Sequence, residues 1–126
     1  MNIPLLIANA PIFLVLPIHI FLGDKDMKAI EPTNKDHGYL EKWVMARGAF
    51  HVVSVDMLMT TVGLLLINFT ALLDSSKTLL LKIMSIYFLL YAIAFFLCIV
   101  ISRSFPKNYL KLIQWAFFIL VSGLIY

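Results

Sequence analysis

Hydrophobic residues fall into four runs, 3–22, 43–73, 78–102 and 109–126, and the segments between them are polar. Each run is close to, or longer than, the roughly 20 mostly apolar residues that a helix needs to cross a bilayer. The pattern predicts four membrane-spanning helices joined by short connections and one longer hydrophilic loop, residues 23–42. We therefore expect an all-α protein, an integral membrane four-helix bundle that forms a single transmembrane domain over residues 1–126.

The second run carries Arg47, His51 and Asp56 in its first third. Ionised side chains are costly in hydrocarbon, so such residues usually face protein or water. At 100° per residue, Arg47, His51 and Ser54 fall on one stripe of a helix, whereas Asp56 points roughly to the opposite side. Two polar faces predict neighbours on both sides, so we expect this helix to be the central one of the bundle.

The first run contains proline at positions 11 and 17. Proline inside a helix frees a carbonyl group four residues earlier, so a kinked or irregular helix is expected here. The run has no basic segment before it and no small-residue cleavage site after it. We therefore interpret it as a retained helix and not as a signal peptide.

Composition supports a membrane environment, because 62% of the 126 residues are hydrophobic and only 13% are charged. A soluble domain of this size cannot bury so much apolar surface. The chain has no basic run interleaved with aromatic residues, so its net charge of +3 does not indicate nucleic-acid binding. The single cysteine, Cys98, excludes an intramolecular disulfide and an electron relay through paired thiols.

Lysine and arginine are distributed unevenly. The loops 23–42 and 103–108, with the helix ends beside them, hold eight of the ten, and the opposite side holds only Lys77 and Lys82. By the positive-inside rule, these two loops lie in the cytoplasm and both termini lie outside the cell membrane.

The candidate site residues form one polar layer in the cytoplasmic leaflet. For His19 and His51, the functional alternatives are proton exchange, a metal or haem site, or hydrogen bonding to a ligand. The structural alternative is a histidine hydrogen-bonded across helices. Two histidines without fixed spacing specify neither zinc nor haem, so we predict no metal site and leave the cofactor unknown.

Asp56 is a candidate proton or ligand site, because a carboxylate among apolar residues needs a cation or several donors. Its structural alternative is a partner such as Gln114, a tyrosine or a second protomer. Arg47 either extends to the lipid phosphates or forms an anion-binding wall with His51. Ser54 and Gln114 lie at a comparable expected depth and complete the candidate set.

The segment from Arg47 to Asp56 resembles the second helix of the four-span membrane enzymes of eicosanoid and glutathione metabolism. The shared features are a basic residue, then histidine, then an acid five residues later, beside a cytoplasmic first loop. Val53 stands where that family commonly has asparagine, Asp56 replaces glutamate, and no proline follows. The resemblance implies that Arg47 holds a glutathione carboxylate in a trimer, but it covers only ten of 126 residues and our interpretation does not rest on it.

Three functions fit these patterns. The one we favour is a small non-enzymatic membrane protein whose polar layer binds a small ligand, an ion or a proton, within a homo-oligomer or a larger membrane complex. The second is a membrane enzyme that acts on a lipophilic substrate with an anionic co-substrate such as glutathione. The third is a purely structural assembly subunit, in which the polar residues only fix helices to one another.

Overall fold

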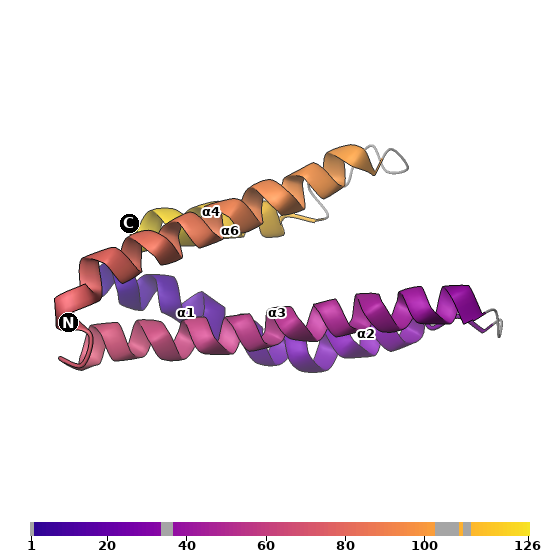
Figure 1. Ribbon diagram of the computed structural model, residues 1–126, viewed down its shortest axis with the longest axis horizontal. Coiled ribbons are helices and arrows are strands. Elements are labelled where there is room, and N and C mark those ends of the chain that lie inside the picture. Colours follow the sequence, from indigo (N-terminus) through magenta and orange to yellow (C-terminus); the bar gives the residue numbers. More distant parts are fainter. Residues whose placement is uncertain (1, 34–36, 103–108, 110–111) are drawn as a thin grey trace. The chain divides into compact units, whose positions relative to one another are not determined.

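The computed structural model describes residues 2–33, 37–102, 109 and 112–126, and these residues form helices and no strand. The elements in chain order are α1 (Ile3–Ile18), η1 (His19–Gly23), α2 (Asp24–Ala29), α3 (His37–Phe69), η2 (Asp74–Ser76), α4 (Lys77–Ile101) and α6 (Gln114–Ile125) (Figure 1). The predicted all-α class is confirmed. The chain divides into two compact units, one of residues 9–66 and one of residues 1–8 with 67–126, and each is described by itself.

In the unit of residues 9–66, α1, η1 and α2 form one continuous helical run. Ile18 and Gly23, at the two joints, both have right-handed helical backbone angles. η1 is a π-helix that begins two residues after Pro17. Proline frees a carbonyl group in the preceding turn, and π-helical segments accommodate such interruptions in the hydrogen-bond ladder. The irregularity predicted from the prolines is therefore present.

This helical run lies antiparallel to α3, and Figure 1 shows α2 alongside the first part of α3. Side-chain hydrogen bonds and ion pairs along the two helices show how they are aligned. They join Asn9 to Thr61, His19 to Ser54, Asp24 to Arg47, and Trp43 to Met27. As the position on the first helix rises from 9 to 27, the position on α3 falls from 61 to 43, so the two helices form a long hairpin.

In the other unit, α4 packs against α6 through a reciprocal pair of serines. The Ser85 hydroxyl donates to the Ser122 carbonyl at 2.9 Å, and the Ser122 hydroxyl donates to the Ser85 carbonyl at 2.8 Å. Asn68, near the end of α3, accepts a hydrogen bond from the backbone N–H of Asn2 at 2.6 Å and donates one to its carbonyl at 3.2 Å. Small side chains and exchanged hydrogen bonds allow such close approach of helix backbones.

Three helical segments are long and apolar enough to cross a membrane, Ile3–Ala29, Gly38–Phe69 and Asp74–Ile101. The fourth expected span, 109–126, falls partly outside the described residues. Within them, α6 has 12 residues. A helix of that length measures about 18 Å, less than the roughly 30 Å of a bilayer core. Much of the segment 23–42 is helical, because α2 extends to Ala29 and α3 begins at His37.

Candidate functional site

Asp24 is the centre of a charged cluster on the hairpin. Arg47 donates to both of its carboxylate oxygens, from Nε to Oδ1 at 2.7 Å and from one terminal nitrogen to Oδ2 at 3.1 Å. Lys28 Nζ lies 2.9 Å from Oδ2, and His51 Nε2 lies 3.1 Å from Oδ1. Charge-assisted and bidentate bonds of this kind are the strongest that side chains form, so the cluster fixes α2 against α3.

The local sequence explains why these groups meet. Asp24 and Lys28 are one turn apart on α2, and Arg47 and His51 are one turn apart on α3. Residues four apart share a helix face, so each helix presents a pair of side chains to the other. One turn further along the hairpin, the Trp43 indole N–H donates to the Met27 carbonyl at 2.8 Å, which sets the register.

The cluster is open to its surroundings. Asp24 is 15% exposed, whereas Arg47 is 30% and His51 44% exposed. The negative charges of Asp24 and Glu31 both act on Arg47. Two nitrogens of Arg47 bind Asp24, and its third guanidinium nitrogen is not part of that pair. An anion that approached this side would find unused donors.

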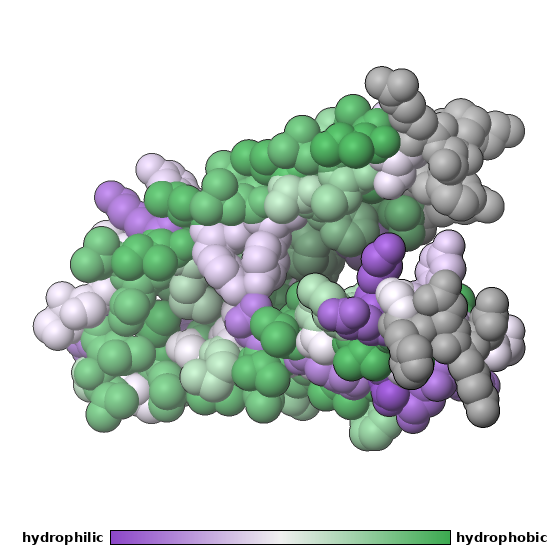
Figure 2. All heavy atoms as spheres, turned by 45° about the vertical axis from the view of Figure 1, so that its right-hand side comes forward, coloured by the Kyte–Doolittle hydropathy of each residue, from purple (hydrophilic) through white to green (hydrophobic). Residues whose placement is uncertain are grey.

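A groove of about 300 Å³ lies beside the cluster on α3, lined by Trp43, Val44, Arg47, Gly48 and His51. The guanidinium carbon of Arg47 lies 5.4 Å from the centroid of the Trp43 ring, in a cation–π contact that orients both side chains. A Cβ built at Gly48 would meet no atom within 4 Å, so the floor of the groove is open. On the face shown in Figure 2, hydrophilic residues gather over α2 and the first turns of α3, whereas most of the surface further along α3 is hydrophobic.

A second polar group lies deeper along the hairpin. His19 Nδ1 lies 3.0 Å from Ser54 Oγ, and the His19 ring stacks on Phe50 with centroids 4.0 Å apart. Phe50 also meets His51 edge to face at 5.7 Å, so one aromatic ring contacts both histidines. Ser54 is 7% exposed, which makes its contact with His19 part of the packed interior of the hairpin.

The structure brings together some of the residues expected from the sequence. Arg47 and His51 meet on Asp24, and His19 and Ser54 meet on each other. Asp56 is partly buried and, five residues after His51 on a regular helix, projects from another side of α3.

Gln114 is exposed at the first residue of α6 and belongs to the other unit.

The sequence analysis does not identify Asp24, because it predicts that residues 23–42 form a hydrophilic loop. Two signals were available. No glycine or proline follows Gly23 until Pro32, so nothing ends the helix between them. Asp24 and Lys28 also stand at the spacing of a helical ion pair, which predicts that the helix continues beyond the apolar run.

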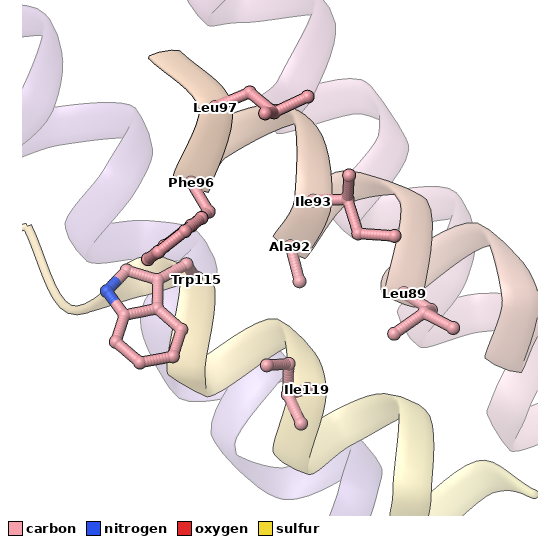
Figure 3. Close-up of a pocket in the computed structure, with 7 residues that line it drawn as sticks. All are labelled: Leu89, Ala92, Ile93, Phe96, Leu97, Trp115 and Ile119. Atoms are coloured by element: carbon pink, nitrogen blue, oxygen red, sulfur yellow. The ribbon is translucent and has the colours of Figure 1, made fainter. Parts of the chain in front are cut away.

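The unit of residues 1–8 and 67–126 contains a separate, wholly apolar pocket of about 250 Å³ between α4 and α6. Figure 3 shows the rings of Phe96 and Trp115 facing each other at one end of it, with Ala92 and Ile119 directed into the space between the helices. It contains no polar group that could orient a ligand. A lining without polar groups suits an apolar occupant.

Within the described residues, no three histidine, cysteine, aspartate or glutamate side chains are grouped so that they could hold a metal ion. The chain matches no protein-family model, no curated protein and no solved structure.

Proposed function

We propose that the chain is a small multi-span membrane protein that binds a small anionic ligand in the groove beside Arg47 and His51. The Asp24 cluster supports this proposal. One carboxylate holds Arg47 and Lys28 in place, and one guanidinium nitrogen of Arg47 is not part of its pair with Asp24. The groove next to it is open and lined on one side by the same arginine.

Three long apolar helices support a position in the membrane. The proposal retains the four-helix bundle, the cytoplasmic side for segments 23–42 and 103–108, the external termini, and assembly into a homo-oligomer or a larger membrane complex. Lys28 and Arg47 lie on the expected cytoplasmic side, where the positive-inside rule favours them.

Ligand binding can be tested by native mass spectrometry of the protein purified in mild detergent. The wild-type protein is expected to retain an anionic small molecule or lipid that Arg47→Gln loses. Lys42→Gln is the matched control, because Lys42 also lies on α3 but contacts the ring of Tyr39, outside the groove. If the wild type and Arg47→Gln retain the same species equally, the proposal is wrong and a purely structural role for the cluster takes its place.

Orientation can be tested with single cysteines in a Cys98→Ser background. Asp26→Cys lies on α2 and Ser75→Cys lies in η2, on opposite sides of the expected membrane. In intact cells, an impermeant maleimide is expected to label Ser75→Cys and to label Asp26→Cys only after the cells are broken. The reverse pattern would invert the proposed topology.

A further inference from the structure

We infer that the anion is the phosphate group of a phospholipid headgroup, held in the groove formed by Trp43, Val44, Arg47, Gly48 and His51. This inference rests on the proposed function and specifies the ligand of the same site. The depth of the groove, the donors of Arg47 and the shape of the groove support it independently of one another.

The depth of the groove follows from the length of α3. The helix has 33 residues and is about 50 Å long, whereas a bilayer core is about 30 Å thick and takes about 20 helical residues. Counted back from Phe69, the apolar part of α3 reaches the region of Phe50. The groove, at residues 43–51, therefore lies where hydrocarbon meets headgroups.

The residues on either side agree with this depth. Tyr39 precedes the groove and Trp43 lines it, and aromatic rings of this kind concentrate at membrane interfaces. Val52 and Val55 follow it and are exposed, as expected of side chains that face acyl chains. A phosphate in the groove would therefore carry its acyl chains towards an apolar surface of the same helix.

The donors of Arg47 suit a phosphate group. Two of its guanidinium nitrogens bind Asp24, and the third is not part of that pair. Arginine offers planar donors that fit phosphate oxygens. Arg47 and Lys28 would repel the choline group of phosphatidylcholine, so an anionic lipid such as phosphatidylglycerol, which lacks that group, is expected to bind better.

The shape of the groove depends on Gly48. Because a Cβ at this position meets no atom within 4 Å, a larger side chain would enter the groove without displacing the chain. Gly48→Leu is therefore expected to occupy the phosphate position while leaving the Asp24 cluster intact. Gly123→Leu is its matched control, because Gly123 lies in α6 and a Cβ there also meets no atom within 4 Å.

The test measures lipid binding by native mass spectrometry after titration with phosphatidylglycerol or phosphatidylcholine in detergent. The wild type is expected to prefer phosphatidylglycerol, and Gly48→Leu and Arg47→Gln are each expected to weaken its binding at least about tenfold, the loss expected for one charge-assisted contact. Arg47→Lys keeps the charge and removes the planar fork, so an intermediate loss is expected. Gly123→Leu should bind as the wild type does, and gel filtration shows which variants are folded.

A second arm separates a lipid from soluble phosphate. Inorganic phosphate at millimolar concentration is expected to leave phosphatidylglycerol bound. If inorganic phosphate displaces it with the same dependence on Arg47, the ligand is a soluble phosphate and the lipid assignment is overturned.

The outcomes also separate this inference from the proposed function. If phosphatidylglycerol binding is unchanged in Gly48→Leu and Arg47→Gln while another anion is lost from Arg47→Gln, the inference fails and the proposed function stands. If no anion depends on Arg47, both fail.

Discussion

The ring of His19 lies flat on the ring of Phe50, with centroids 4.0 Å apart and planes within 5° of parallel. The same phenylalanine lies against the backbone of Gly23, so closely that a Cβ added there would collide with its ring. The π-helical segment, which contains both His19 and Gly23, therefore meets α3 through one aromatic side chain. Close packing of Phe50 at this point requires that residue 23 has no Cβ.

Gly23→Ala is expected to destabilise the protein. The new methyl would force Phe50 away from Gly23 and disturb its stack on His19. Inserting a methyl group into a packed site costs about 1–3 kcal/mol, which exceeds the roughly 1 kcal/mol that alanine gains over glycine in a helix. Thermal unfolding in detergent, followed by circular dichroism, measures the difference.

Gly123→Ala is the matched control for this change. Gly123 lies in α6, and a Cβ there meets no atom within 4 Å, so only the gain in helix propensity of about 1 kcal/mol is expected. Equal stability of the two variants would show that Phe50 can move without loss, and the argument about the stack would be wrong.

Asp24→Asn is expected to lower the melting temperature, because Arg47 and Lys28 lose the carboxylate that they share. The drop should be larger than that caused by Lys28→Gln. Lys28→Gln removes one contact of a side chain that is 58% exposed, whereas Asp24→Asn also weakens the two contacts made by Arg47. Exposed ion pairs contribute little to stability, so the order of the two losses is the informative result.

Adding Arg47→Gln to Asp24→Asn tests whether the two residues act as a pair. The double variant is expected to lose less than the sum of the two single losses, because removing the arginine also removes the charge that Asp24→Asn leaves uncompensated. Strict additivity would show that the pair seen at 2.7 Å contributes nothing specific to stability.

Helical periodicity predicted which residues of α3 share one stripe, and the structure shows that this stripe meets the first helix. Arg47, His51 and Ser54 were placed on one stripe by their spacing, and each contacts a residue of the helical run 3–29. This part could be predicted because the period of an α-helix is fixed and α3 has no interruption. The partner of Arg47 could not be read in the same way, because it depends on how far the first helix continues.

The apolar pattern ends at Leu22, whereas the helix ends at Ala29. Hydropathy reports where a helix leaves the hydrocarbon, and turn-forming residues report where it ends, so the two boundaries differ by seven residues here. The π-helical segment at His19–Gly23 alters the angular position of everything after it, and the prolines predicted an irregular helix but not the size of this change. Asp24 therefore reaches Arg47 through an irregularity that periodicity alone does not encode.

Thr61→Val is expected to leave stability unchanged or to raise it by up to about 1 kcal/mol. In the described part of the chain, Thr61 Oγ1 and Asn9 Oδ1 are buried side-chain oxygens without a hydrogen-bond partner. Valine has the shape of threonine and removes the unsatisfied hydroxyl. Thr61→Ser is the control, since it keeps the hydroxyl, removes a methyl group and should destabilise by about 1 kcal/mol. A clear loss in Thr61→Val would indicate that a bound water satisfies the hydroxyl.

The serine pair of α4 and α6 gives a prediction about additivity. Each hydroxyl donates to the carbonyl of the other serine, so the two hydrogen bonds are separate although the hydroxyl oxygens lie only 3.1 Å apart. Ser85→Ala and Ser122→Ala are each expected to lower stability by about 0.5–1.5 kcal/mol, the range of interhelical hydrogen bonds in membranes. The carbonyls keep their bonds within their own helices, so the losses should add in the double variant, measured by unfolding in detergent. A double loss no larger than one single loss would mean that the hydroxyls bond to each other instead.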